Sequence, residues 1–366
     1  MSSLFRKLVI VGLSGGVDSA VTAFLLKRAG YVVEAVFMKN WQDSSDESCS
    51  MSVDFKDAIL VSEVLKIKLH VINFAIEYWN KVFQHFLDEY ALGRTPNPDI
   101  LCNKEIKFRA FLDYARSLGA EFIATGHYAR KNTIDGKELL LKASDKSKDQ
   151  TYFLYLLNQE QLLATIFPIG NLTKFQVREI AKNAGLPNHA KKSSTGICFI
   201  GERKFKTFLS GYLLSRPGNI VTTDNKIIGR HHGLMFYTYG QRKGICIGGQ
   251  QGRPEAPWYV ADKDLSSNTL IVTQEKNHSL LMSKKIICDK VHWINNEKIS
   301  LPLKCQAKIR YRQLDQECII IKDQKTNHIS VEFFNAEWAV TPGQSIVFYD
   351  KDICLGGGII SSRISF

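Results

Sequence analysis

The first half of the chain alternates short apolar runs with amphipathic segments. The apolar runs have the length and β-branched content of strands buried on both faces, and they occupy residues 7–13, 31–38, 68–74 and 120–126. Segments with apolar side chains at helical spacing lie between and beside them, at residues 18–29, 55–65, 76–92 and 104–118. This order of strands and helices predicts an α/β fold with a doubly wound, mostly parallel sheet.

The alternation fades near residue 185, and short β-branched runs separated by turn residues take its place. These runs lie at residues 268–274, 304–312, 318–322, 328–334 and 344–350. Two glycine-rich stretches, 239–252 and 354–360, belong to the same half of the chain. The pattern predicts a C-terminal antiparallel β-barrel preceded by a small central domain. We place the three domains at residues 1–200, 201–280 and 281–366.

A glycine-rich loop joins the first predicted strand to the first predicted helix. Its residues are Gly12, Leu13, Ser14, Gly15, Gly16, Val17, Asp18 and Ser19. Glycines let backbone N–H groups approach a phosphate, and the helix N-terminus adds positive potential. We expect Ser14 and Ser19 to bind phosphate oxygens. Asp18 is expected to orient Mg²⁺, because a carboxylate repels phosphate. A structural turn capped by Ser14 and Asp18 is the alternative.

Charge and hydropathy limit the class of partner. The net charge is +12, and residues 186–253 hold eleven lysines and arginines against two acidic residues. A basic segment with interleaved aromatic residues favours a nucleic acid partner, although a generally basic surface explains the charge equally well. No apolar run is long enough to predict a transmembrane helix, and the N-terminal residues are typical of a first strand rather than a signal peptide. The cysteines are scattered through a large chain, which suits a reducing cytoplasm better than a disulfide scaffold, so we expect a cytoplasmic protein.

Two of the eight cysteines lie in segments that favour reactive thiols. The chain has no C-x-x-C pair, so we expect neither a zinc ribbon nor a redox hairpin, and we name no cysteine as a metal ligand. Cys102 lies in a segment rich in proline and asparagine, which we interpret as a loop before a helix that begins at Lys104. Cys198 lies among lysines and arginines, which favour the thiolate. Asp99 precedes Cys102 by three residues and can transfer a proton. A small buried side chain is the alternative for either cysteine.

A phosphate-binding loop and two reactive thiols together suggest one reaction. ATP activates a carbonyl oxygen by adenylation, and sulfur carried on one cysteine replaces that oxygen. The second cysteine releases the sulfur by forming a disulfide with the first. The basic central segment suggests that the carbonyl belongs to RNA.

Eight motifs spread over nearly the whole chain resemble the tRNA-specific 2-thiouridylases, which belong to the PP-loop ATP pyrophosphatases. They are GLSGGVDS, TPNPDILCNKEIKF, ATGHYAR, KDQTYFL, STGICFIGER, YTYGQRKGICIGG, IRYRQ and CLGGGII. The resemblance implies a PP-loop domain, a small central domain and a C-terminal β-barrel. It implies ATP-dependent adenylation of the C2 oxygen of the wobble uridine in tRNA. Sulfur transfer from a cysteine persulfide then gives 2-thiouridine, AMP and pyrophosphate.

The resemblance also implies roles for single residues. Cys102 is the nucleophile that frees the sulfur, Cys198 carries the persulfide, and Asp99 is the acid or base. A sulfur-relay protein or a cysteine desulfurase charges Cys198. The implied ATP-binding residues are Gly12 to Ser19, Met38 and Gly126, although Met38 fits core packing equally well. The implied tRNA contacts are Asn97, Pro98, Asp99, His127, Lys148, Asp149, Gln150, Arg310, Tyr311 and Gln344.

Residues 42–50, QDSSDESCS, depart from the more acidic segment of that family. This leaves a metal or partner role of Asp43, Asp46 and Glu47 open, and Cys49 is expected to take no part in the reaction. Three alternatives also stay open. Two are other PP-loop ATP pyrophosphatases: the argininosuccinate or GMP synthetase type, which needs no paired thiols, and the tRNA lysidine synthetase type, which needs RNA but no cysteine pair. The third alternative is a tRNA-binding protein that keeps the loop as architecture only.

Overall fold

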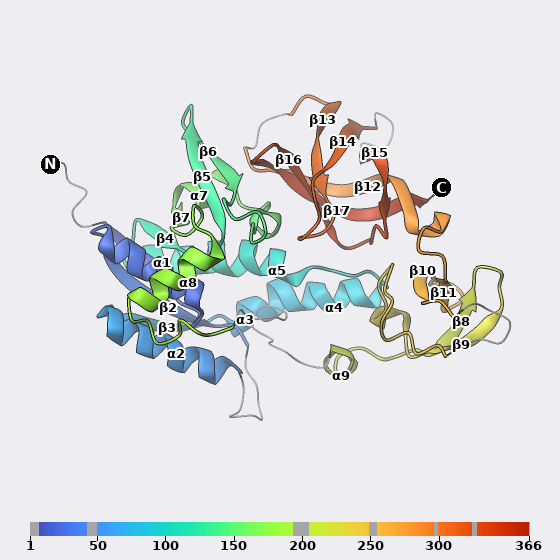
Figure 1. Cartoon of the computed structure of the whole chain (residues 1–366), viewed down its shortest axis with the longest axis horizontal. Helices are drawn as coiled ribbons and strands as arrows, with labels where there is room; N and C mark the ends of the chain where they lie inside the picture. The colour runs from blue at the N-terminus through green and yellow to red at the C-terminus, as the bar shows by residue number, and fades with distance from the viewer. Residues whose placement is uncertain are drawn as a thin grey trace.

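The N-terminal unit is built on a parallel sheet, which confirms the predicted α/β class. A computed structural model describes residues 7–41, 50–192, 205–248, 255–295, 299–323 and 328–365. The sheet has five strands in the order β3-β2-β1-β4-β7. Figure 1 shows it at the N-terminal end of the molecule, with α1, α2 and α8 beside it. Their bounds are β1 Leu8–Gly12, β2 Val32–Lys39, β3 Leu69–Asn73, β4 Phe122–Ala124 and β7 Thr165–Ile166.

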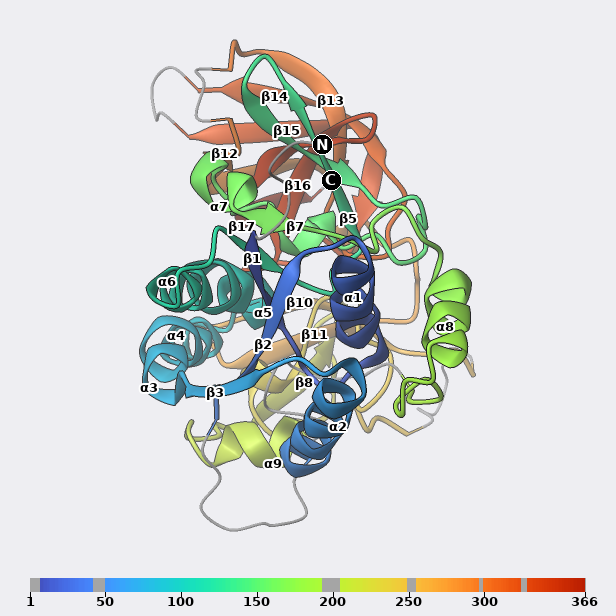
Figure 2. The ribbon, with the colours of Figure 1, turned by 90° about the vertical axis from the view of Figure 1, so that its left-hand side faces the viewer.

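Helices cover both faces of this sheet because alternate residues of each strand point to opposite sides. Val9 and Val11 of β1 pack with the first set, which comprises α1 Val17–Arg28, α2 Ser50–Leu65 and α8 Lys174–Asn183. Ile10, between them, packs with the helices of the other face. Figure 2 shows α1, α2 and α8 on one side of the strands and α3, α4 and α6 on the other.

Each helical segment of the second face is continuous through a π-helical stretch. The first comprises α3 Ala75–Tyr78, η1 Trp79–Phe83 and α4 Gln84–Ala91, in close agreement with the predicted helix. The second comprises α5 Pro98–Leu101, η2 Cys102–Ala110 and α6 Phe111–Ser117. It begins six residues before the predicted start at residue 104, and the candidate cysteine therefore lies within it.

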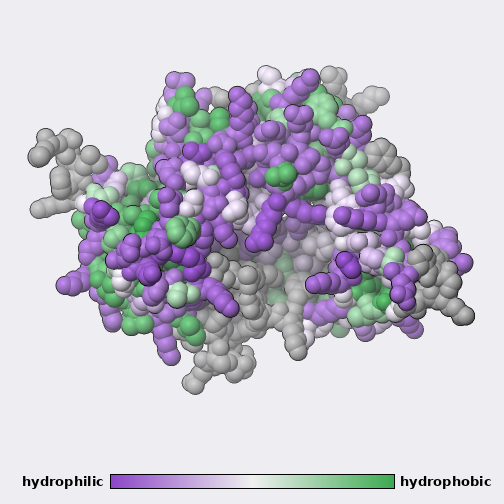
Figure 3. Space-filling model, viewed as in Figure 1, coloured by the Kyte–Doolittle hydropathy of each residue, from purple (hydrophilic) through white to green (hydrophobic). Residues whose placement is uncertain are grey.

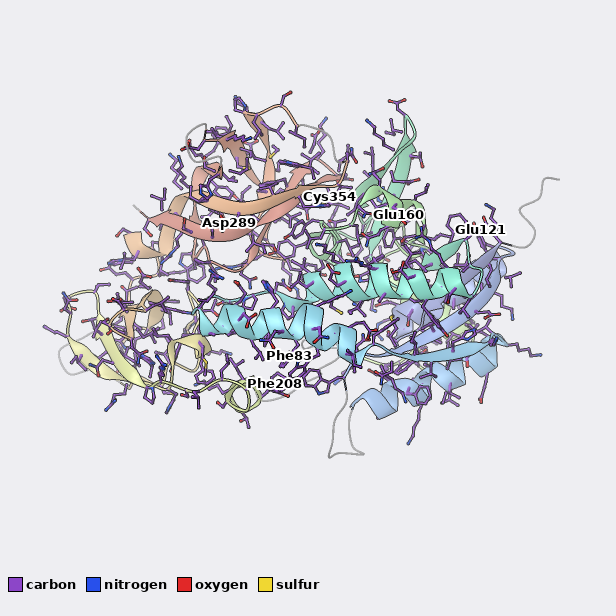
Figure 4. The ribbon with its side chains drawn as sticks, turned by 180° about the vertical axis from the view of Figure 1, so that it is seen from behind. Phe83, Glu121, Glu160, Phe208, Asp289 and Cys354 are labelled. Carbon is purple, nitrogen blue, oxygen red and sulfur yellow. The ribbon has the colours of Figure 1, made fainter. Side chains whose placement is uncertain are left out.

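The central unit is a small sheet with strand order β10-β11-β8-β9. Its strands are β8 Gly218–Thr222, β9 Ile227–His231, β10 Tyr259–Asp264 and β11 Thr269–Thr273. The short helix α9 Phe205–Ser210 leads into it. The ring of Phe208 in α9 lies tilted against that of Phe83 in η1, with ring centroids 5.7 Å apart (Figure 4). This aromatic contact attaches the central unit to the helices of the N-terminal unit.

The C-terminal unit is a closed antiparallel barrel, as predicted. Its strands run in the order β12-β15-β14-β13-β16-β17, and β12 also pairs with β17. Their bounds are β12 Met282–Trp293, β13 Leu303–Lys308, β14 Gln316–Lys322, β15 Ile329–Trp338, β16 Ser345–Asp350 and β17 Ile353–Ser365. No predicted strand corresponds to β12.

A hairpin from the N-terminal unit extends the sheet of the barrel. Its strands are β5 Ala129–Ile134 and β6 Lys137–Lys142. Leu140 and Leu141 of β6 pair with Cys354 and Ile353 of β17. The domain boundaries near residues 200 and 280 stay a prediction. Through this hairpin, a strand of the N-terminal unit is hydrogen-bonded to a strand of the barrel.

The remaining short helices lie in connections. They are η3 Thr151–Phe153, α7 Gln159–Leu163, η4 Leu234–Phe236 and η5 Ser279–Leu281. Hydrophilic residues dominate the face seen in Figure 3, and hydrophobic ones are scattered among them. None of the helices in the described ranges has the length and hydropathy needed to cross a membrane.

Candidate active site

Hydroxyl groups hold the loop between β1 and α1. Ser19 Oγ accepts the N–H of Ser14 at 3.2 Å and donates to the Gly16 carbonyl at 3.0 Å. The two serine hydroxyls lie 3.3 Å apart. Gly16 is the N-cap of α1, so no side chain caps the first N–H groups of this 12-residue helix. The helix start therefore keeps donors and positive potential for an anion.

Three glycines allow the close packing around this loop. Gly15 has φ of +75°, and a Cβ atom there would lie 2.2 Å from the carbonyl oxygen of Asp54. A Cβ atom on Gly126, two residues after β4, would lie 2.7 Å from the backbone nitrogen of Ser19. On Gly12 it would lie 3.3 Å from the Cε atom of Met38. The residues predicted to bind ATP thus meet at the carboxyl edge of the sheet.

The carboxylate of Asp18 has two partners that sequence analysis missed. Lys174 Nζ lies 2.6 and 2.8 Å from its two oxygens, and the Tyr128 hydroxyl donates to it at 2.8 Å. Burial, and then the charge of Asp18, raises the pKa of Tyr128. Thr173 and Gln176 form a capping box at the start of α8. That signature could have placed Lys174 at a helix start, but only the fold places it beside Asp18.

The segment that follows α8 binds the same loop. The side-chain amide of Asn188 donates to the Gly15 carbonyl at 2.9 Å, and Lys191 Nζ lies 3.3 Å from that oxygen. Lys191 also pairs with Asp54, at 2.6 Å, and with Asp57. Burial lowers the pKa of Lys191, but its hydrogen bonds to these two carboxylates raise it above the usual value. No pattern in the sequence predicts these contacts.

Several predicted residues lie outside the described part of the chain. They are Cys198, Cys49, Asp43, Asp46 and Glu47. The described chain stops at residue 192, directly after the contacts with the glycine-rich loop.

Cys102 lies inside a helix, and the expected loop before Lys104 is wrong. The helix begins at Pro98, and the side chain of Asn97 accepts the N–H of Asp99 at 3.2 Å. Proline suits the first helical position because its fixed φ fits the helix and the missing N–H is not needed there. The side chain of Cys102 is fully buried in the core that covers the sheet.

The turn before this helix contacts the barrel through Gln344, one of the predicted tRNA contacts. The amide of Gln344 donates to the carbonyl of Thr95 at 2.6 Å, and the N–H of Thr95 donates to the carbonyl of Pro342 at 3.1 Å. A Cβ atom on Gly343 would lie 2.9 Å from the Thr95 nitrogen. The barrel thus fixes the turn that precedes Asn97.

Other predicted residues meet on the side of the barrel that faces η2. The Tyr311 hydroxyl donates to the Lys148 carbonyl at 3.3 Å, and its ring lies 4.6 Å from that of Phe153. The side-chain amide of Asn103, next to Cys102, donates to the Phe153 carbonyl at 3.0 Å. Phe153 therefore contacts both the helix that carries Cys102 and the loop that carries Tyr311.

The side chains of Asp149 and Gln150 are engaged within the protein. Asp149 is buried, and its carboxylate accepts the N–H of Ala143 at 3.0 Å and the hydroxyl of Thr151 at 2.9 Å. The side-chain oxygen of Gln150 accepts the N–H of Tyr128 at 2.8 Å. Both side chains thus shape the turn, and their predicted contact with tRNA stays a prediction.

Arg310 and His127 are also held by neighbours. The Arg310 guanidinium donates to the Ala339 carbonyl at 2.7 Å and lies 5.2 Å from the Trp338 ring. Burial lowers the pKa of Arg310. His127 is buried, with Nδ1 2.8 Å from the Thr125 hydroxyl. Burial lowers the pKa of His127 well below its usual value, so the ring is neutral.

Three family models match successive parts of the chain. A tRNA methyl transferase HUP domain matches residues 7–202, a tRNA methyl transferase PRC-barrel domain residues 206–274, and an aminomethyltransferase β-barrel domain residues 283–360. A solved complex of a 4-thiouridine synthetase with RNA and ATP has 17% identity and a TM-score of 0.38 over 56% of this chain and 50% of its own. That similarity is too low to carry an argument.

Curated relatives match almost end to end. The tRNA-specific 2-thiouridylase MnmA of Legionella pneumophila (strain Lens) is 57% identical, over 97% of this chain and 99% of the relative. The enzyme of the same name from Proteus mirabilis is 55% identical over 100% of both chains, and that from Coxiella burnetii 54% over 97% and 98%. On this similarity, which extends through the glycine-rich loop, both candidate cysteines and the barrel, the chain belongs to the tRNA-specific 2-thiouridylase family.

Proposed function

We propose that this protein converts the wobble uridine of tRNA to 2-thiouridine, with ATP as the activating substrate. The observation that carries the proposal is the start of α1, where Gly16 leaves the first N–H groups without a side-chain cap. A simple turn needs no such arrangement at the carboxyl edge of a parallel sheet, where ligands of this fold class bind. Membership of the family gives the reaction.

In this proposal the loop from Gly12 to Ser19 holds the phosphates of ATP, while Met38 and Gly126 border the nucleoside. The described residues fit a protein-held Mg²⁺ poorly. Asp18 already pairs with Lys174 and Tyr128, and the described ranges contain no group of three potential ligands. Mg²⁺ would therefore arrive bound to phosphate oxygens and water, and Asp18 acts by fixing Lys174.

The two cysteines divide the sulfur chemistry. The C2 oxygen of uridine attacks the α-phosphorus of ATP and releases pyrophosphate. The Cys102 thiolate attacks the Sγ atom of a Cys198 persulfide, so a disulfide forms and the outer sulfur leaves as hydrosulfide. That sulfur attacks C2, and AMP leaves with the former oxygen. Asp99 takes up a proton during these steps, and an external thiol reduces the disulfide. A partner protein that carries a persulfide supplies each new sulfur.

Mass spectrometry of tRNA tests this function. After incubation with ATP, Mg²⁺ and a persulfide donor, we expect one uridine in the anticodon to gain sulfur in place of oxygen. Cys198→Ser should abolish the gain but keep the tRNA-dependent release of pyrophosphate, because adenylation needs no thiol. Cys246→Ser, which changes an exposed cysteine of the central unit, is the matched control. Normal thiolation by Cys198→Ser would refute the carrier role. A PP-loop enzyme that transfers an amine should keep its activity when Cys102 or Cys198 is replaced by serine.

A further inference from the structure

Two thiols that the reaction does not use face each other in the C-terminal barrel. Cys305 of β13 and Cys318 of β14 are direct partners in the antiparallel register, and their Sγ atoms lie 3.8 Å apart. Opposed residues of antiparallel strands have Cα atoms about 4.5–5.5 Å apart, within the range that a disulfide spans. Rotation of the two side chains can therefore bring the sulfur atoms into bonding distance without separating the strands.

The two thiols differ in access to solvent. Cys305 is partly exposed, whereas Cys318 is fully buried. The contact with Cys305, and then burial, raises the pKa of Cys318. Cys305 is therefore the thiol that an external reagent meets first, and Cys318 reacts only with a sulfur already at Cys305.

The other barrel cysteines lack this arrangement. Burial raises the pKa of Cys288 to about 12 and also raises that of Cys354. Both side chains are buried, at 1% and 2% exposure, and none of their strand partners is a cysteine: Cys288 pairs with Ile329 and Ile360, and Cys354 with Tyr349 and Leu140. Geometry and access together single out one pair.

We propose that Cys305 and Cys318 form an oxidation-sensitive pair that closes to a disulfide when the protein meets a small-molecule disulfide such as oxidised glutathione. The Cys305 thiolate attacks one sulfur of the reagent and releases one thiolate. The Cys318 sulfur gives up its proton and attacks the Cys305 Sγ atom, which expels the second. Two protein thiols thus lose two protons and two electrons, and the reagent is reduced to two thiols.

The bond would link the two strands of one hairpin at the middle of their ladder. Residues 309–315 connect β13 to β14 and include Arg310 and Tyr311, which contact Ala339 and Lys148. A cross-link between the two strands restricts this hairpin in the unfolded chain, so oxidation should raise the melting temperature of the barrel. The modification is independent of the proposed tRNA chemistry, because it requires neither the glycine-rich loop nor Cys102.

Peptide mapping of the full-length protein tests the proposal. Trypsin places the two thiols on separate peptides, CQAK at 305–308 and QLDQECIIIK at 313–322. After treatment with oxidised glutathione we expect these peptides as one linked species, two hydrogens lighter than their sum, which dithiothreitol separates. Alkylation of both thiols in the treated protein, or linkage of Cys305 to any other cysteine, would overturn the proposal.

Variants supply a second readout. Cys305→Ser should remove the linked species and the oxidative rise in melting temperature, whereas Cys354→Ser, a buried barrel cysteine, should keep both. If Cys305→Ser does not fold, the wild-type map decides alone. A rise of the same size in Cys305→Ser would assign the effect to another pair and refute the proposal.

Discussion

At the residue scale, the candidate site depends on backbone positions that admit no side chain. Gly15 combines a left-handed backbone with a carbonyl oxygen in the place where a Cβ atom would lie. A Cβ atom on Gly126 would lie 2.7 Å from the backbone nitrogen of Ser19, against 2.2 Å for Gly15 and the carbonyl oxygen of Asp54. The sequence marked both glycines as ligand contacts, and the structure adds that each is also required by packing.

Gly15→Ala should weaken ATP binding roughly tenfold or more and lower stability, because φ of +75° and the contact with Asp54 both oppose a Cβ atom. Isothermal titration with ATP and urea unfolding measure the two effects. Gly30→Ala is the matched control, since Gly30 has φ of +92° but open space around it. It should cost about 1 kcal/mol of stability and leave ATP binding unchanged. Equal effects of both variants would contradict the steric argument.

His127 makes stability depend on pH. Its pKa is lowered in the folded protein, so below about pH 6.5 the unfolded chain binds a proton that the native state does not. Its contribution should therefore be complete above pH 7.5 and decrease as pH falls through 6.5, by up to about 1.4 kcal/mol per pH unit. The unfolding free energy of His127→Asn should fall less steeply between pH 7 and 5. Parallel curves for the two proteins would exclude His127 as the cause.

At the scale of elements, pairs of helices and strands bring distant residues together. Lys174 is the first residue of α8, and it reaches Asp18 in the first turn of α1 across 156 positions. The segment with η3 links the N-terminal unit to the barrel in the same way: the Tyr152 hydroxyl donates to the Ser345 carbonyl at 2.8 Å. Figure 4 shows the two long helices running below the barrel, and Cys354 of β17 packs with the core to which these helices belong.

Lys174→Met should raise the dissociation constant of ATP by roughly tenfold, because Asp18 would then face the phosphates without its cation. Lys174→Arg should retain much of the affinity, since it keeps the charge. Lys182→Met changes an exposed lysine of the same helix and is the control. The readout is ATP binding at fixed excess Mg²⁺ together with thermal stability. Loss of affinity in Lys182→Met of the same size would indicate a general charge effect instead.

At the scale of the whole molecule, charge suits a polyanion. The net charge is +12, and Arg242 and Lys243 are exposed on the central unit. When lysines and arginines of a protein displace counterions from the phosphates of a nucleic acid, the affinity of the complex falls steeply with salt. Basic residues dispersed over the whole surface would give the same net charge of +12 without forming a docking surface. The two explanations differ in which basic residues tRNA binding requires.

The affinity for a tRNA transcript should fall by about tenfold or more between 50 and 200 mM salt. Arg242→Gln with Lys243→Gln should weaken binding and reduce the slope of log affinity against log salt by roughly one unit for a lost phosphate contact. Lys66→Gln with Lys68→Gln removes the same charge from exposed positions on the N-terminal unit. If the two double variants behave alike, the central unit is not the docking surface. Fluorescence anisotropy measures all three proteins.

The sequence by itself determined the classes of structure and the chemistry. Alternating apolar runs predicted the parallel sheet, because the period of hydrophobic residues reports burial directly. The loop from Gly12 to Ser19 predicted a phosphate site, because few backbones need that many glycines at a helix start.

Only the tertiary structure decided what surrounds these residues. It placed Cys102 inside a helix, paired Asp18 with Lys174, and opposed Cys305 to Cys318 across two strands. Local patterns contain no information about contacts across 156 positions, since such contacts depend on how whole elements pack. The start of the helix at Pro98 was missed for a different reason, because proline is favoured both in loops and at the first helical position.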